Sequence, residues 1–194
     1  LAGRPEQALA AYRNVLQDYP KTPLAAEAQF RIGYAHETSL DDFDAARLEY
    51  AKVRDQSVSS VFFAQAAQRQ QRLDRLSRFR GAGADSSGHS AGADSSDRKL
   101  EAGFLLAEQY LFELDKPERA LEAYAGIARE HVGTAAAAKA MNAQAWVLRH
   151  KLERPAEADS LLWRVVREYP ATEAQLAARD YLESQGQAVP AEII

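Results

Sequence analysis

Residues 5–37 read as a helix, a stop and a second helix, and this unit limits the possible folds more than any other stretch. Pro5 suits the first position of a helix, where a backbone N–H is not needed. The first helix must end at Tyr19-Pro20, because the residue before a proline is driven out of the α region. Thr22 then offers a side-chain oxygen as the N-cap of the second helix. The stretch therefore predicts a pair of helices joined by a short turn.

The helix that opens this unit recurs along the chain. Each copy has an alanine, a large side chain four residues later, and a branched apolar residue three further on, which is the spacing of a buried helix face. The alanines are Ala8, Ala46, Ala120 and Ala158, the large residues Tyr12, Tyr50, Tyr124 and Leu162, and the branched residues Val15, Val53, Ile127 and Val165. The first two alanines and the last two are 38 residues apart, and the middle pair is 74 apart. The repeat predicts an all-α fold, an α-solenoid of antiparallel helix pairs with about nine helices.

The helix that precedes each of the last three copies carries a small residue in the same register. These residues are Gly33, Ala107 and Ala145. Small residues allow two helix backbones to approach closely. A glycine inside a helix costs about 1 kcal/mol relative to alanine, so we expect Gly33 to lie at a tight crossing. Replacing Gly33 with leucine should overpack that crossing and cost about 1–3 kcal/mol.

The repeated helices and the stretches between them predict that the chain has three regions. Residues 1–79 form the first group of helices, 80–98 a flexible loop rich in Gly, Ser and Asp, and 99–194 a second group that ends in a capping helix. The loop contains no apolar side chain large enough to offset the entropy of ordering it. We expect a polar face on the capping helix, including Gln175, because repeat arrays need a soluble end. The expected helices are 5–18, 23–38, 43–54, 59–79, 99–114, 117–130, 134–152, 155–168 and 173–185.

Five arginines between Arg69 and Arg80 make the end of the fourth expected helix basic. They are either solvated cations that favour a helix C-terminus or a docking patch for an acidic partner.

The composition excludes several kinds of site. The chain has no cysteine, which rules out a thiol nucleophile, a disulfide framework and a cysteine-ligated zinc site. The net charge of −4 argues against general nucleic-acid binding. No apolar run is long enough to span a bilayer, which needs about 20 residues. The four histidines show no ligand spacing, and no HExxH, P-loop or GxGxxG motif is present. We expect no catalytic residues, no metal site and no cofactor, and therefore a non-enzymatic protein.

The pattern resembles the tetratricopeptide repeat. A tetratricopeptide unit is a pair of helices, and by this resemblance 23–38 is the first helix of a unit, whereas 5–18 and 43–54 are second helices. The resemblance is carried by Phe30-Arg31-Ile32-Gly33 and Phe104-Leu105-Leu106-Ala107 in first helices, by the Ala…Tyr…Val spacing of second helices, and by the Tyr-Pro that follows. It departs from the family in its repeat length, which is about 34 residues there, and in Gln71 and Gln144. The resemblance implies a right-handed superhelix whose first helices line the concave side and bind a protein or peptide.

By this resemblance the residues that face a partner lie on the first helices around the small residue. They are Glu27, Phe30, Tyr34 and Glu37; Glu101, Phe104, Glu108 and Leu111; and Lys139, Asn142, Trp146 and Arg149. The alternative for these positions is that about half of them are core, since Phe30 and Phe104 occupy equivalent places.

The resemblance implies a scaffold or adaptor for protein–protein interaction. The sequence pattern Tyr-Pro-x-Thr-x-x-Ala…Phe-Arg-Ile-Gly-Tyr is similar to that of bacterial envelope repeat proteins of the BamD and YbgF type. It favours a role in envelope assembly or secretion, in the periplasm or cell envelope. Two alternatives stay open: a structural module that self-associates into a homo-oligomer, and a regulatory appendage of an enzyme that lies outside this stretch.

Overall fold

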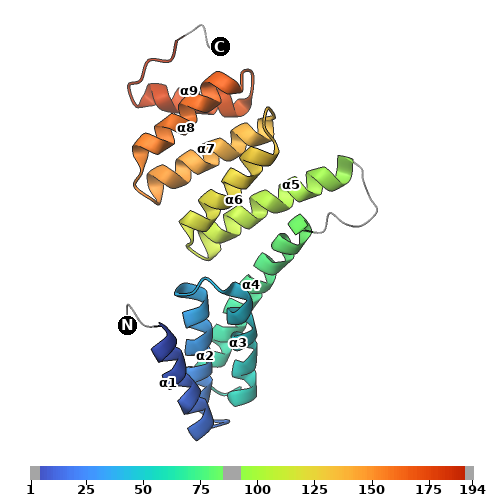
Figure 1. The fold of residues 1–194 in the computed structure, drawn as a ribbon, viewed down its shortest axis with the longest axis vertical. Coiled ribbons are helices and arrows are strands. Elements are labelled where there is room, and N and C mark those ends of the chain that lie inside the picture. Colours follow the sequence, from blue (N-terminus) through green and yellow to red (C-terminus); the bar gives the residue numbers. More distant parts are fainter. Residues whose placement is uncertain (1–4, 85–92, 191–194) are drawn as a thin grey trace. The chain divides into compact units, whose positions relative to one another are not determined.

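The computed structural model describes residues 5–84 and 93–190 (Figure 1). Regular structure in these ranges is entirely helical, with nine α-helices and one π-helical segment. The elements are α1 (Pro5–Asp18), α2 (Pro23–Thr38), α3 (Phe43–Gln56), α4 (Val61–Ala84), α5 (Ala93–Glu108), η1 (Gln109–Glu113), α6 (Pro117–Glu130), α7 (Ala135–His150), α8 (Pro155–Glu168) and α9 (Glu173–Ser184). Consecutive helices pack on one another from α1 to α3 and from α5 to α9. The predicted all-α, repeat-like solenoid is confirmed.

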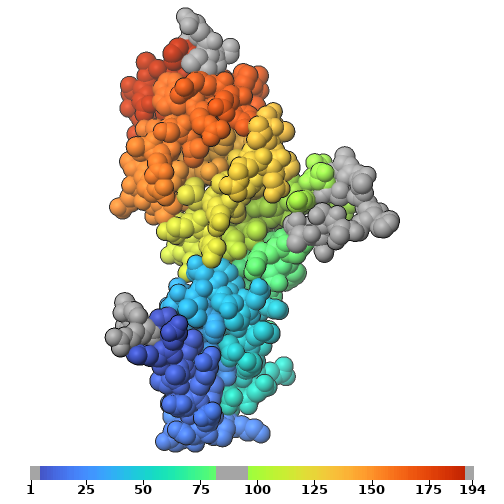
Figure 2. Space-filling model, viewed as in Figure 1, coloured from blue at the N-terminus to red at the C-terminus, as the bar shows by residue number. Residues whose placement is uncertain are grey.

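The chain divides into two compact units, Leu1–Arg78 and Phe79–Ile194. The first holds α1, α2, α3 and most of α4, and the second holds α5 to α9. In the second unit α7 contacts α6, α8 and also α9. Figure 2 shows the side chains of α7, α8 and α9 closing into a continuous mass in the orange to red part of the chain. Because α5, α7 and α9 alternate with α6 and α8 along the chain, the unit has one face made by first helices and one made by second helices.

The turn between one helix pair and the next has the same design three times. A threonine caps the following helix: Thr22, Thr134 and Thr172 accept from the N–H three residues on, at 3.1–3.3 Å. Each threonine hydroxyl also donates to the carbonyl three residues back, at 2.6–2.8 Å. The residue before the threonine adopts a left-handed conformation in every case, with φ of 58° at Lys21, 80° at Gly133 and 61° at Ala171. The cap predicted at Thr22 is therefore confirmed and recurs at Thr134 and Thr172, and the turn geometry does not depend on the identity of its left-handed residue.

The turn inside each helix pair repeats as well. A leucine N–H (Leu40, Leu114 or Leu152) donates to the carbonyl five residues back, at 3.1–3.2 Å. The acidic residue that follows is left-handed, with φ of 51° at Asp41, 50° at Asp115 and 55° at Glu153. The next N–H reaches the carbonyl six residues back, at 2.8–2.9 Å. The same Leu–acid pair thus forms this turn three times, although a leucine followed by an acidic residue also occurs inside helices, as at Leu48-Glu49.

The repeat positions form the core, as predicted. Ala46, Ala120 and Ala158 are 0% exposed, and their large and branched followers are buried. The first copy differs, because Ala8, Tyr12 and Val15 on α1 are only half-buried. Gly33 lies at a close crossing: a Cβ built on it would be 2.8 Å from two ring carbons of Tyr50. The predicted tight approach at this glycine is confirmed.

The structure corrects three sequence-based details. The limits predicted for the loop, 80–98, are too wide, because α4 continues to Ala84 and α5 begins at Ala93; residues 85–92 lie outside the described residues. The expected helix 99–114 ends in the π-helical segment Gln109–Glu113. Gln175 is not on a polar outer face: it is 5% exposed and donates to the Val166 carbonyl at 3.1 Å while accepting from the Ala171 N–H at 2.9 Å. The buried Gln175 amide thus supplies hydrogen-bond partners for the Val166 carbonyl of α8 and for the Ala171 N–H of the turn that follows.

Candidate partner-binding groove

A groove of about 800 Å³ runs over the first-helix face of the second unit. Its walls come from α5, α7 and α9, which the turns described above place on one side. Five of the predicted partner-facing residues line it, namely Glu101, Phe104, Glu108, Lys139 and Asn142. Leu100, Leu105 and Phe104 supply its apolar part, and Leu105 is 37% exposed. The groove thus combines exposed apolar surface with charged groups within one unit.

The charges around the groove are mostly negative. Asp97, Glu101, Glu108 and Glu173 line it, against a single cation, Lys139. The Lys139 ammonium lies 4.7 Å from the centre of the Phe104 ring, an arrangement that favours a cation over an aromatic face. All four carboxylates are exposed. Carboxylates gathered in a concave site focus a negative potential that attracts cationic groups.

Tyr124 on α6 lies behind the groove, and the Glu108 carboxylate affects the pKa of its hydroxyl. Burial, with a further contribution from the Glu108 carboxylate, raises the pKa of Tyr124 to about 12. Its ring packs 6.1 Å from that of Phe104, measured between centres. Phe104 therefore contacts both Tyr124 of α6 and Lys139 of α7.

A smaller pocket of about 210 Å³ lies further along α7. Trp146 and Arg149, both predicted to face a partner, line it together with Tyr181 of α9. Asn142 lines both this pocket and the groove, so the two hollows are adjacent. The Asn142 amide donates to the Ala174 carbonyl at 2.7 Å, which ties α7 to the start of α9. Seven of the twelve predicted residues thus lie around two neighbouring hollows.

Leu111, the remaining predicted residue of α5 and η1, is 3% exposed and packs in the core with Ala107 and Ile127. The alternative that such positions are core applies to it.

The four predicted residues of the first unit line neither of these two hollows. Phe30 is 5% exposed and Glu37 is 5% exposed, so both belong to the core. Glu27 is half-buried and forms an ion pair with Arg31 at 3.2 Å. Tyr34 is 39% exposed and remains available as surface.

Glu37 instead joins three helices. The Tyr50 hydroxyl of α3 donates to its carboxylate at 2.5 Å, and the Arg69 guanidinium of α4 donates at 2.9 Å. The Arg69 guanidinium also lies 4.8 Å from the centre of the Tyr34 ring. Burial, and next the hydrogen bond to Glu37, raise the pKa of Tyr50 above its usual value. Arg69 is therefore a structural cation and not part of a free basic patch. One sequence signal could have identified the pair of Glu37 and Arg69. It is an acidic residue at a core-facing position of one helix, followed by an arginine at a core-facing position of a later helix.

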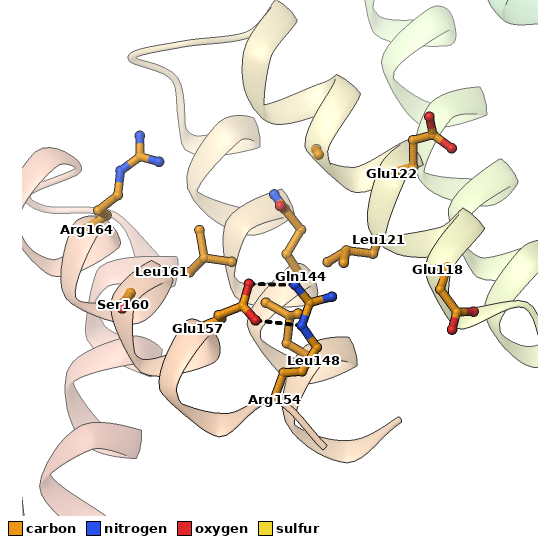
Figure 3. Close-up of a pocket in the computed structure, with 11 residues that line it drawn as sticks. Glu118, Leu121, Glu122, Gln144, Leu148, Arg154, Glu157, Ser160, Leu161 and Arg164 are labelled. Atoms are coloured by element: carbon orange, nitrogen blue, oxygen red, sulfur yellow. Dashed lines mark hydrogen bonds and ion pairs between the residues drawn. The ribbon is translucent and has the colours of Figure 1, made fainter. Parts of the chain in front are cut away.

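A third hollow, of about 500 Å³, lies on the opposite face between α6 and α8 (Figure 3). Most of its charged side chains are paired with another charge. The Arg154 guanidinium donates two hydrogen bonds to the Glu157 carboxylate, both 2.6 Å, and Figure 3 shows the two groups facing each other. Arg164 pairs with Glu168 at 3.2 Å. Charges that are already paired give this cleft little attraction for a charged ligand, unlike the groove on α5, α7 and α9.

Two further kinds of site were sought in the described part of the chain. No group of three or more His, Asp or Glu side chains in 5–84 and 93–190 is arranged to hold a metal ion. Of the helices in the same ranges, none has the length and apolar character needed to cross a membrane.

Comparison with known proteins bears on the repeat. Residues 1–22 match the family model of the tetratricopeptide repeat. Neither the curated proteins nor the solved structures include a match to the chain. The matched segment holds α1 and the Tyr19-Pro20 stop that follows it. The same stop recurs as Tyr169-Pro170 after α8. The match is limited to this segment, and the helix-pair architecture of the described residues is consistent with a tetratricopeptide-like solenoid; tetratricopeptide repeats generally mediate protein–protein interaction.

Proposed function

We propose that this protein is a non-enzymatic scaffold that binds an extended, cationic peptide segment of a partner protein in the groove of α5, α7 and α9. The observation that carries the proposal is the gathering of four exposed carboxylates around one lysine on a partly apolar concave surface. A peptide with lysine or arginine side chains matches this potential, and its aliphatic stems match the apolar floor. The proposed contact residues are Glu101, Phe104, Glu108, Lys139 and Asn142.

The direct test uses a short fluorescein-labelled peptide of alternating lysine and serine, with fluorescence anisotropy of the whole chain. The double variant Glu101→Lys/Glu108→Lys should weaken binding by about tenfold or more, because like charges then face each other across the interface. The matched control is Glu118→Lys/Glu122→Lys, which makes the same change of charge at the opposite cleft. The control should bind nearly as well as the unchanged chain.

Two results would refute the proposal. Equal weakening in both double variants would mean that the peptide follows net charge and not the groove. Tighter binding by an alternating glutamate–serine peptide would mean that the groove selects the opposite charge. Binding should also weaken as ionic strength rises, since exposed charge interactions are screened.

The cellular role is a separate proposal. The resemblance of the Tyr-Pro-x-Thr wording to bacterial envelope repeat proteins supports a partner in envelope assembly or secretion. Fractionation of cells that produce the tagged full-length protein tests it, and recovery in the cytosol alone would count against it. Size measurement at two concentrations tests the alternative of self-association, for which a strict monomer is the contrary result.

A further inference from the structure

The small pocket on α7 is lined by aromatic side chains and alanines. Trp146 and Tyr181 provide aromatic walls, and Leu162, which is buried, lies at its base. The remaining apolar lining consists of alanines, namely Ala145, Ala177 and Ala178. Alanines beside two aromatic side chains leave room in the pocket, and Trp146 is 44% exposed. Large exposed aromatic surface of this kind marks interaction sites.

The π-helical segment extends this aromatic surface. It places Leu111 in the core, while Phe112, the next residue, is 65% exposed. The Phe112 ring lies 6.2 Å from that of Trp146, and the His150 ring lies 5.0 Å from Trp146 on α7 itself. π-helical segments are rare and occur often at functional sites. The segment thus sends one side chain into the core and the next to the edge of the pocket.

The pocket is close to electrically neutral, in contrast to the groove. The Arg149 guanidinium lies 5.2 Å from the centre of the Tyr181 ring and is paired with the Asp159 carboxylate. Asp159 also accepts from the Gln187 amide at 3.0 Å, which fixes its position. The Arg149 charge is therefore paired with Asp159, while its Nε atom is buried without a hydrogen-bond partner. A neutral apolar group fits this environment better than a charged one.

We propose that this pocket is an anchor site for one aromatic side chain of the peptide that occupies the groove. The inference rests on the proposed function and adds a second recognition element to it. Asn142 borders both hollows and lies one helical turn from Trp146, which is about 6 Å along α7. An extended peptide covers that distance in about two residues. The partner segment therefore carries its aromatic residue within a few positions of its cationic residues.

The experiment compares three versions of the alternating lysine–serine peptide: the parent, and versions in which one serine is replaced by phenylalanine or by alanine, with the replaced position scanned along the peptide. At one or two neighbouring positions the phenylalanine peptide should bind roughly tenfold more tightly than the alanine peptide. Trp146→Ala should remove this preference, so that the phenylalanine and alanine peptides bind equally well. Phe112→Ala should reduce the preference and serves as the second variant if Trp146→Ala does not fold. Tyr19→Ala, which removes an aromatic residue that is 54% exposed in the other unit, is the matched control and should keep the preference.

A second readout needs no substitution. The chain has two tryptophans, Trp146 and Trp163, so its nitrogen–proton NMR spectrum contains two indole signals. The Trp163 indole N–H donates to Gln187 at 2.8 Å, and this side chain does not line the pocket. The phenylalanine peptide should shift the Trp146 signal strongly and the Trp163 signal little.

The outcomes separate the two proposals. Equal affinity of the phenylalanine and alanine peptides at every position, with the Trp146 signal unmoved, overturns the anchor site and leaves the cationic groove intact. If no lysine peptide binds, the proposed function is wrong, and N-acetylphenylalaninamide alone then decides the pocket. A shift of the Trp146 signal by this compound supports a ring-binding pocket, and no shift overturns it.

Discussion

Gly33→Ala should destabilise the first unit, although alanine is the better helix former. The added Cβ would be 2.8 Å from Cδ1 and Cε1 of Tyr50 and 3.2 Å from its Cγ. The ring is 1% exposed, and its hydroxyl is hydrogen-bonded to Glu37, so it has little room to move away. Overpacking of this kind costs about 1–3 kcal/mol. Two atoms in close contact place the cost in the upper part of that range.

The helix propensity gained by alanine is about 1 kcal/mol. The net loss of unfolding free energy is therefore about 1–2 kcal/mol for Gly33→Ala. Gly126→Ala on α6 is the matched control, because nothing lies within 4 Å of a Cβ at that position. That substitution should stabilise its unit by up to about 1 kcal/mol. The same chemical change is thus expected to have opposite signs at two helical glycines.

Urea denaturation measures both effects. Both tryptophans belong to the second unit, so tryptophan fluorescence reports Gly126→Ala, whereas far-ultraviolet circular dichroism reports both units. Adding Tyr50→Leu to Gly33→Ala gives the residue types that occupy the equivalent positions Ala145 and Leu162, both of which are buried. A double-mutant cycle should then recover about 1–2 kcal/mol as coupling between the two sites. Equal stabilisation by Gly33→Ala and Gly126→Ala would refute the close approach of Gly33 to Tyr50.

Three further predictions concern the turns, a tyrosine and the core. Ala171 has a left-handed φ of 61°, and Gly133 occupies the equivalent position of another turn. Ala171→Gly should stabilise the second unit by roughly 0.5–1 kcal/mol, and Gly133→Ala should destabilise it by a similar amount. Thermal melts that show the reverse signs would contradict the turn geometry. The folded-state pKa of Tyr124, about 12, exceeds the ordinary value of 10.0, so its contribution to stability is complete below pH 10 and is lost as the pH rises toward 12; Tyr124→Phe should flatten this fall in urea titrations between pH 9 and 12, and an unchanged slope would disprove the assignment. Phe30→Ala should cost about 3–5 kcal/mol of stability in the first unit, since the ring is buried against Phe62, and a melt close to that of the unchanged chain would show that the ring is surface.

The helices and their order were predictable from the sequence because their signals are local. A proline at a first position, a threonine cap and a Tyr-Pro stop act over a few residues, and α6 and α8 begin and end where such signals predict. The repeated alanine and its followers identify one buried face per helix. The longer reach of α4 and α5 was missed because Gly, Ser and Asp carry weak helix propensity, and their neighbours, not their composition, decide whether a helix continues.

The exposure of the partner-facing positions was decided only by tertiary structure. Phe30 and Phe104 occupy equivalent places in the repeat, yet Phe30 is buried against Phe62 of α4, 5.2 Å away, while Phe104 lines an open groove. Glu37 is likewise covered because Arg69, 32 residues later, reaches its carboxylate. Periodicity states which face of a helix points inward toward its own partner helix. Whether the other face stays open depends on a helix that is remote in sequence, and no local pattern records that contact.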